Sequence, residues 1–355
     1  MTTSSSLLFA VGTRAAPPPT KELKLKRGIH IGKRWALLLL VALLGVVMAK
    51  QTTAAPKAVK DLKVGVSMYT LGAPYFAAQA DSIKKHGEEL GLKVIVTNAN
   101  DDMTKQLNDV QDLLAQKIDL LLLNPLDPKG LIPATKAATK AGVPVVIFDS
   151  SIDPAADFVT TVQSNNTRNG ELVGEWLASH VPGAIHMALI SGAKGNPVGQ
   201  ARRDGVFMGI IEQQLRTNGT AGFTIEGQGW GNWAPEGGLN AMQDLLTAHP
   251  SVNVLLAEND SMALGAMQAI KARGKEGKIL VCAAADGQKE AIALIKQGKY
   301  GATGMNDPAL VGQTALDVGL KYLNGQKDIL KVTYTPPIAI TQENADQYYH
   351  PAAIF

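Results

Sequence analysis

The sequence predicts an α/β protein of two doubly wound lobes, each a parallel sheet covered by helices, joined by a hinge that the chain crosses three times. From Asp61 onward, short β-rich runs alternate with helical patterns, as in βαβ units. After the run 158–163 the alternation starts again. The 355 residues, 46% of them hydrophobic, are also enough for two modest cores, whereas a single core stops growing near roughly 250–300 residues.

The first lobe is expected to contain four strands separated by three helices. The strands are expected at 62–68, 92–98, 118–124 and 143–149, and the helices at 75–90, 103–116 and 131–141. The lobe as a whole is expected to comprise residues 60–163 plus 307–334.

The second lobe repeats the first in type and is expected to comprise residues 164–306 plus 335–355. After a run at 158–163, helices are expected at 168–180, 201–215 and 288–297, and strands at 185–191, 223–227, 253–257, 278–285 and 301–305. The three crossings are expected near 163–165, 305–307 and 334–337. No helix-turn-helix precedes the first strand, which weighs against a DNA-binding repressor.

Residues 1–55 are expected to be a signal peptide with an N-terminal extension. Lys33 and Arg34 precede an apolar run of about 15 residues, 35–49, which is short for a membrane span of roughly 20 and typical of an export signal. Cleavage is expected after Ala49 or Ala55, and no cysteine near either site offers a lipid anchor. The alternatives are an uncleaved anchor and a misassigned start codon. The folded part is expected in the periplasm.

Charge and cysteine content exclude several classes. The net charge of +3 arises from the first 55 residues, because the rest of the chain carries 26 basic and 30 acidic residues. A mildly acidic folded part has no basic surface for nucleic acid. The single cysteine, Cys282, cannot form an internal disulfide, and its apolar surroundings at 279–285 predict a buried thiol.

The sequence contains no convincing motif for catalysis, a metal or a cofactor. Gly227, Gly229 and Gly231 lack the spacing of a dinucleotide loop, and the glycines at 192, 195 and 199 are not followed by Gly-Lys-Ser/Thr. The histidines share no metal-ligand spacing, and no serine or cysteine stands in a nucleophile elbow. We therefore expect no catalytic residue, no metal and no cofactor.

Three polar residues follow one predicted strand directly. The strand 253–257 ends at Glu258, Asn259 and Asp260, and a helix then starts at Ser261. In open α/β sheets ligands bind beyond the carboxyl ends of the strands, so at least one of these residues is expected to touch a ligand. Alternatively they only cap the helix, with Asp260 or Ser261 as the N-cap.

Other strand ends and loops repeat this arrangement with aromatic rings, carboxylates, amides and a guanidinium. Such a set suits a neutral polyhydroxy ligand, because ring faces cover C–H surfaces while polar groups bond hydroxyls. The ligand-binding candidates are Tyr75, Phe76, Asp149, Ser150, Arg202, Trp233, Asn259, Asp286 and Asn306. Asn124, before Pro125, is expected to serve a turn.

Most of these candidates also have a structural alternative. The aromatic pair at 75–76 could make core contacts at a helix start, and Trp233 could anchor its Gly-rich loop. Asp149 and Asp286 could cap the helices that follow them. Arg202 could be a solvated surface residue, because the neighbouring Arg203 and Asp204 suggest an exposed turn. Either Arg202 or Arg203 is expected to face the ligand.

The stretch 237–270 resembles the periplasmic sugar-binding proteins of ABC importers, the ribose-binding group in particular, and the resemblance extends over about residues 59–336. It implies a type I periplasmic binding protein fold. It also implies a small neutral sugar or polyol as ligand, an ABC transporter permease with its ATPase as partner, and a monomer. A sugar-sensing receptor domain for chemotaxis or a sensor kinase, and an exported carbohydrate-active enzyme, are the alternatives.

The resemblance assigns a role to most of the candidate residues. Tyr75 and Phe76 match the paired aromatics that hold the sugar from the first lobe, and Asp149 matches the carboxylate of that lobe. In the second lobe Arg202 matches an arginine, and Arg203 is the alternative if Phe207 anchors the alignment. Trp233 matches a stacking aromatic, and Asn259 and Asp286 match an amide and a carboxylate beside the ligand. Asn306 matches the hinge amide.

Three departures from the ribose-binding pattern affect the expected ligand. Ala73 replaces an asparagine, Ser150 replaces an arginine, and the loop 68–73 is about two residues longer. The lost donors predict a ligand other than ribose, with a linear polyol or a different pentose favoured over a hexose. The carboxylates at 149 and 286 argue against an acidic sugar, because like charges would meet in the cleft.

Overall fold

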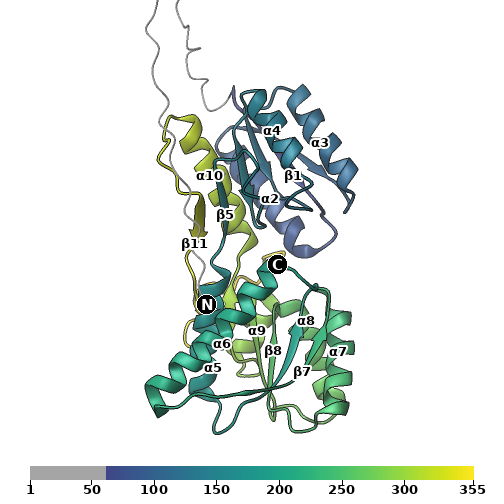
Figure 1. Ribbon diagram of the computed structural model, residues 1–355, viewed down its shortest axis with the longest axis vertical. Helices are drawn as coiled ribbons and strands as arrows, with labels where there is room; N and C mark the ends of the chain where they lie inside the picture. The colour runs from purple at the N-terminus through teal and green to yellow at the C-terminus, as the bar shows by residue number, and fades with distance from the viewer. Residues whose placement is uncertain (1–60) are drawn as a thin grey trace, which may run out of the picture. The chain divides into compact units, whose positions relative to one another are not determined.

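The computed structural model describes residues 61–355, and the predicted signal peptide lies outside them. Two six-stranded sheets, each flanked by helices, form two lobes (Figure 1). No helix in the range 61–355 is long and apolar enough to cross a membrane. The predicted fold class is confirmed.

The first sheet is parallel throughout and has the strand order β11-β5-β4-β3-β1-β2. Its strands are β1 (Lys63–Met68), β2 (Lys93–Asn98), β3 (Leu120–Leu123), β4 (Val145–Phe148), β5 (Thr160–Ser164) and β11 (Val332–Thr335). Its helices are α2 (Pro74–Glu89), α3 (Met103–Ala115), α4 (Ile132–Lys140) and α10 (Pro308–Leu323). The strand order reverses between β1 and β3, which is where doubly wound sheets open a crevice for ligands.

The second sheet has the order β12-β10-β9-β8-β6-β7, with β12 antiparallel to β10 and the other pairs parallel. Its strands are β6 (His186–Ser191), β7 (Thr224–Trp230), β8 (Val254–Ala257), β9 (Leu280–Asp286), β10 (Thr303–Met305) and β12 (Ala339–Ile340). Its helices are α5 (Asn166–His180), α6 (Pro197–Asn218), α7 (Pro235–Ala248), α8 (Asp260–Ala272), α9 (Lys289–Lys296) and α11 (Ala345–Tyr348).

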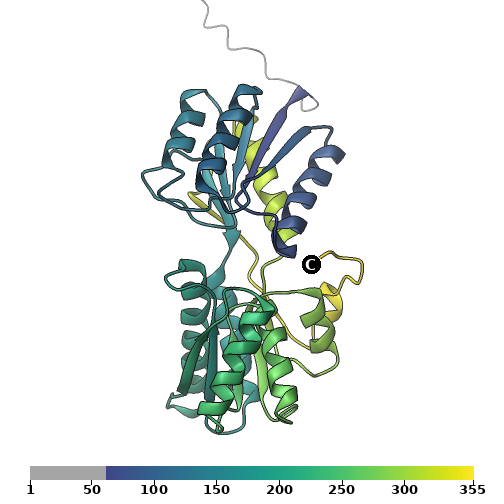
Figure 2. The same cartoon turned by 90° about the vertical axis from the view of Figure 1, so that its right-hand side faces the viewer.

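The chain passes from one sheet to the other between β5 and β6, between β10 and β11, and between β11 and β12, which gives the three crossings (Figure 2). The exact residue boundaries of the two lobes stay a prediction.

Each sheet has an apolar cluster on both faces. In β3, Leu120 and Leu122 face α2 and α10, whereas Leu121 and Leu123 face α3 and α4. This explains why β3 is apolar at every position instead of alternating, because both of its faces are covered. Cys282 is fully buried among the α5 and α6 contacts, as predicted, and burial raises the pKa of its thiol to about 12.

The largest differences from the sequence prediction concern α6 and β7. The helix begins at Pro197, four residues before the expected start, because the Asn196 side chain accepts from the backbone N–H groups of Val198 and Gly199. It ends at Gly219, whose φ of 70° suits glycine. The strand continues to Trp230 through Gly227 and Gly229, whose missing side chains leave space for α7 residues.

Glycines bring α5 and α6 into backbone contact. A Cβ on Gly205 would lie 2.1 Å from the Thr167 carbonyl oxygen, and one on Gly170 would lie 2.2 Å from the Arg202 carbonyl oxygen. Side chains cannot relax such contacts because both partners are main chain. The packing therefore fixes the start of α5 and the start of α6 against each other.

We expect Gly205→Ala to lower the free energy of unfolding by about 2 kcal/mol or more, since overpacking typically costs about 1–3 kcal/mol and outweighs a helix-propensity gain of about 1 kcal/mol. Urea denaturation measures this. The control is Gly222→Ala, where an added Cβ meets nothing within 4 Å. Equal stability of the two variants would contradict the tight packing of α5 on α6.

Candidate functional site

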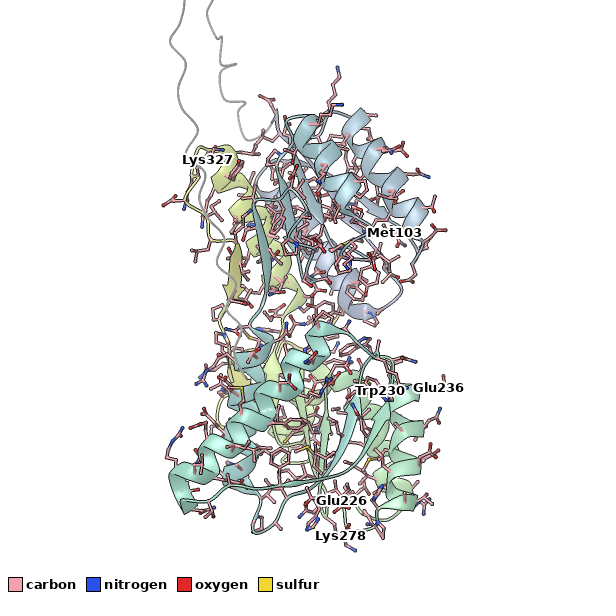
Figure 3. The ribbon with its side chains drawn as sticks, viewed as in Figure 1. Met103, Glu226, Trp230, Glu236, Lys278 and Lys327 are labelled. Atoms are coloured by element: carbon pink, nitrogen blue, oxygen red, sulfur yellow. The ribbon has the colours of Figure 1, made fainter. Side chains whose placement is uncertain are left out.

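A cavity of about 180 Å³ lies between the lobes, at the carboxyl ends of strands of both sheets. Strand β7 shows the orientation, because Glu226 lies at the far end of the second lobe and Trp230 near the end that faces the first lobe (Figure 3). All nine candidates from the sequence line this cavity: Tyr75, Phe76, Asp149, Ser150, Arg202, Trp233, Asn259, Asp286 and Asn306. The sequence thus predicted which side chains gather there, and their contact with a ligand stays a prediction.

The first lobe contributes an aromatic wall from the start of α2. Tyr75 and Phe76 lie edge to face, with ring centroids 5.2 Å apart, and Tyr69 packs on Phe76 at 4.8 Å. Pro74 occupies the first turn of α2, where a missing N–H costs nothing. The rings therefore project from a rigid helix start.

A chain of hydrogen bonds joins the two lobes across the cavity. The Tyr75 hydroxyl lies 2.6 Å from Asp149 Oδ1 and 3.1 Å from Asn306 Oδ1. The Asn306 amide in turn donates to Asp286 Oδ1 at 3.1 Å and accepts from the Ser164 hydroxyl at 2.6 Å. Because Tyr75 has one proton for two acceptors, the network has spare acceptor capacity that ligand hydroxyls can use.

Arg202 supplies the guanidinium of the site. It is 4% exposed, which excludes the solvated-surface alternative. Its Nη2 lies 2.8 Å from Asp286 Oδ1, its Nε donates to Asn166 Oδ1 at 2.9 Å, and its Nη1 donates to the Glu258 carbonyl at 3.0 Å. The cavity lining includes Arg202 and not Arg203, whose guanidinium pairs with the Glu258 carboxylate at 2.8 Å.

Trp233 lies against the end of β6 because Gly192 leaves room for its ring. A Cβ on Gly192 would lie 2.2 Å from the indole. The Trp233 carbonyl accepts from the Asn259 amide at 3.2 Å, and the Arg202 guanidinium lies 5.8 Å from the indole centroid. The indole therefore lies beside Gly192 and the Arg202 guanidinium, while Asn259 binds the backbone of the same residue, and Trp233 lines the cavity.

Of the three polar residues after β8, only Asn259 lines the cavity. Asn259 is also the N-cap of α8, because its Oδ1 accepts from the Met262 N–H at 3.0 Å, so the alternative that Asp260 or Ser261 caps this helix is wrong. Glu258 is 1% exposed and accepts from the Gly192 N–H at 2.8 Å.

Asp260 is fully buried and organises the loop after β9. Its carboxylate accepts from the backbone N–H groups of Asp286, Gly287 and Gln288 and from the hydroxyls of Tyr300 and Thr303. Burial raises the pKa of Asp260, and the Tyr300 hydrogen bond opposes that rise. This carboxylate fixes the backbone that presents Asp286 to the cavity.

The capping alternatives for the two cavity aspartates are also wrong. The N-cap of α9 is Gln288 instead of Asp286, and no helix starts after Asp149, which adopts φ 65° where the chain turns out of β4. Asn124 is fully buried, donates to Gln79 Oε1 at 3.4 Å and is not among the residues that line the cavity, and its predicted role in a turn stays a prediction.

Several lining residues were not predicted from the sequence. They are Tyr69, Pro74, Asn166, Asn196, Val198, Ser261 and Phe355, together with Ala73, which the sequence marked only as a departure. Asn196 and Val198 follow from the early start of α6. Asn166 lies at the first crossing between the lobes, and a polar side chain next to a predicted crossing could have been proposed as a lining residue. Nothing in the sequence near Phe355 indicated a role.

Burial shapes the electrostatics of the cavity. Desolvation raises the pKa of Asp149, while hydrogen bonding from Tyr75 and the charge of Arg202 oppose the rise. Desolvation and the nearby Asp149 charge raise the pKa of Tyr75, which stays protonated as a donor. Within residues 61–355 no three His, Cys, Asp or Glu side chains are grouped to hold a metal ion.

Comparisons with known proteins agree with this fold. The family model described as a periplasmic binding protein domain matches residues 64–327. The chain is 34% identical to the ribose import binding protein RbsB of Bacillus subtilis over 283 residues, which is 79% of this chain and 87% of that protein. It is 28% identical to RbsB of Escherichia coli, over 81% of this chain and 93% of that protein.

Solved structures are similar over nearly their whole length. An ABC transporter solute binding protein of Mycobacterium smegmatis with bound glycerol has a TM-score of 0.71 and 32% identity, and the match covers 82% of this chain and 98% of that one. A periplasmic solute binding protein of Actinobacillus succinogenes with bound D-allose has a TM-score of 0.71 and 28% identity, covering 81% and 100%. The chain therefore belongs to the periplasmic binding protein family, among the ribose-binding-like type I solute-binding proteins of ABC importers.

Proposed function

We propose that this protein captures a small neutral sugar or sugar alcohol between its lobes and delivers it to an ABC transporter permease with its ATPase. The observation that carries the proposal is the cavity itself. There an aromatic wall from the first lobe faces the Arg202–Asp286 pair of the second, and the network through Tyr75 and Asn306 joins them. Ring faces beside paired donors and acceptors suit the mixed C–H and hydroxyl surface of a polyol.

Charge favours a neutral ligand. The cavity contains two carboxylates, Asp149 and Asp286, and one guanidinium, Arg202, which already pairs with Asp286. An anionic ligand would add a third negative charge with no free cation in the cavity lining to offset it. The cavity volume of about 180 Å³ lies below the roughly 300–1,000 Å³ of drug-sized sites, which favours a monosaccharide-sized solute.

The lining around Ser150 favours a ligand other than ribose. Ala73 and Ser150 both line the cavity, and neither supplies the donors of the ribose-binding pattern. A binding site of this kind discriminates strongly against a ligand whose hydroxyls do not match its hydrogen-bonding groups. Relatives named for ribose or for ribose and allose, and a structure with glycerol, support a sugar or polyol class. Within it we propose a linear polyol or another pentose over a hexose.

The family places the protein outside the cytoplasm, and the segment 1–55 is proposed as the cleaved export signal. We propose that the protein acts as a monomer. A receptor domain that reports its ligand to a sensor would use the same cavity, and a neighbouring permease gene would favour transport. We also propose binding without catalysis, because the cavity carboxylates are engaged in a hydrogen-bond network; recovery of an added sugar unchanged by mass spectrometry tests this.

A thermal-shift panel of pentoses, hexoses, C4–C6 polyols and sugar acids tests the proposed ligand class. At about 100 times its Kd a ligand stabilises by about 2.7 kcal/mol, which raises the melting temperature by roughly 4 °C at an unfolding entropy of about 2.1 cal/mol/K per residue for a folded part of this size. We expect the largest shift from a neutral polyol or a pentose other than ribose. A sugar acid that outcompetes every neutral compound, or nanomolar ribose binding, would contradict the proposed ligand.

Lobe closure should accompany binding. The three crossings allow rotation through a few backbone torsions, and closure would join surfaces of both lobes for the permease. We expect the radius of gyration from small-angle X-ray scattering to fall when the best compound of the panel is added at saturation. A radius that stays constant would exclude a closure mechanism.

Replacing Asp149 by asparagine should change the pH dependence of stability. Because burial raises the Asp149 pKa, the folded protein keeps a proton on this carboxyl that the unfolded chain releases. The stability that this bound proton provides is therefore fully present below the ordinary pKa of aspartate and is lost as pH rises through the folded pKa. We expect Asp149→Asn to gain stability relative to wild type as pH rises from about 4 to 8. Urea denaturation across this range measures the difference.

The exposed Asp328→Asn variant is the matched control and should follow wild type at every pH. If the stability of Asp149→Asn relative to wild type instead rises as pH falls, the ionised Asp149 carboxylate stabilises the folded, ligand-free protein, and the expected direction of its pKa shift is wrong.

A further inference from the structure

The Phe355 side chain lines both the ligand cavity and a second, larger cavity, the outer cavity. The outer cavity, of about 440 Å³, is lined mainly by α2 and α10 of the first lobe and by α9 and the segment 348–355 of the second. Phe355 and Asp286 are the two residues that line both cavities. The ring is therefore part of the wall of the ligand cavity, although it lies far along the chain from every other lining residue.

The segment that carries Phe355 is attached to the second lobe. Lys289 on α9 donates to the Ala353 carbonyl oxygen at 2.6 Å. Lys296, also on α9, lies 2.7 Å from the Asp346 carboxylate and 4.6 Å from the centroid of the Tyr349 ring. The segment therefore moves with the lobe that carries Arg202 and Asp286.

The ring of Phe355 contacts the opposite lobe. Its centroid lies 5.3 Å from that of Tyr75, with the planes at 86°, an edge-to-face geometry. In both views the end of the segment lies between the lobes, beside the start of α2 (Figures 1 and 2). Tyr75 is the residue whose hydroxyl joins Asp149 and Asn306, so Phe355 buttresses the side chain at the centre of the polar network.

We propose that Phe355, one of the five aromatic residues that line the cavity, is a specificity-determining residue that contacts the sugar and limits its size. The proposal rests on the proposed function. A pentose fills the cavity against the ring, whereas the added hydroxymethyl group of the homologous hexose meets it. Removal of the ring opens the cavity toward the outer one, so the extra group finds room and the smaller sugar loses a packing surface.

Isothermal titration calorimetry with homologous pairs tests this: D-ribose with D-allose, L-arabinose with D-galactose, and D-xylose with D-glucose. For a pair in which wild type binds the pentose, we expect Phe355→Ala to weaken pentose binding about 2- to 12-fold, the range of an aromatic contact. The hexose should weaken less or gain, so that the pentose-to-hexose preference falls.

Two variants act as controls. Ile354→Ala removes a neighbouring exposed side chain that lines only the outer cavity, and it should keep both the affinity and the preference of wild type. Phe355→Tyr keeps the ring and should restore the pentose preference. The melting temperature of each free variant shows whether the fold is intact.

The possible outcomes separate the two proposals. If wild type binds none of the six sugars, the role of Phe355 is overturned. The proposed function then fails as well only if the C4–C6 polyols of the thermal-shift panel also give no shift. If wild type binds a pentose and Phe355→Ala keeps the same affinity, or weakens both members of a pair equally, only the specificity role is overturned.

Discussion

The buried ion pair between Arg202 and Asp286 is the interaction on which the rest of the site depends. Both side chains are almost fully buried, at 4% and 9% exposure, and their atoms approach to 2.8 Å. Burying two charges is costly unless further hydrogen bonds satisfy them. Here the Arg202 guanidinium also donates to the Asn166 side chain and to the Glu258 carbonyl, and the Asn306 amide donates to the Asp286 carboxylate. The pair thus draws together α5, α6, β8, β9 and the second crossing.

Maintaining this pair requires a scaffold that fixes each partner independently. On one side, glycine contacts bring α5 and α6 together at main-chain distance. On the other, five donors converge on the Asp260 carboxylate and hold the turn after β9, which carries Asp286. Asp260 and these glycines position the residues that line the cavity without lining it themselves. Substitutions at these positions should therefore affect binding although none of them contacts the ligand.

The fold and most of the site could be predicted from local patterns, because each relies on a rule that acts over a few residues. Alternating β-rich and helical runs located the main strands and helices. Polar and aromatic residues at strand ends and in the loops after them, together with the resemblance to the ribose-binding group, located all nine predicted lining residues. Predicted helix starts were wrong where a side chain caps the helix at an unexpected position. Asn196 is the N-cap of α6, so that helix starts early, and Asn259, not Asp260, is the N-cap of α8.

What the sequence could not predict is contact between distant segments. Phe355 lies against Tyr75 across 280 positions of the chain, and no periodicity or motif marks it. The choice between Arg202 and Arg203 depended on which face of α6 packs on α5, a matter of tertiary contact. Asp260 looked like a cap or a ligand residue from its neighbours alone, and its actual partners come from β9, β10 and the loops beside them.

The close contact of α5 with α6 has a mechanical consequence. Helix α5 begins directly after the first crossing, and α6 begins beside the cavity, carries Arg202 and continues for 22 residues. Because the two backbones touch, they form one stiff arm pivoting at the hinge. At about 1.5 Å per residue that arm is roughly 33 Å long, so a rotation of about 10° displaces its far end by roughly 6 Å. A small adjustment around a bound molecule is thereby converted into a large displacement at the outer end of the second lobe, far from the cavity.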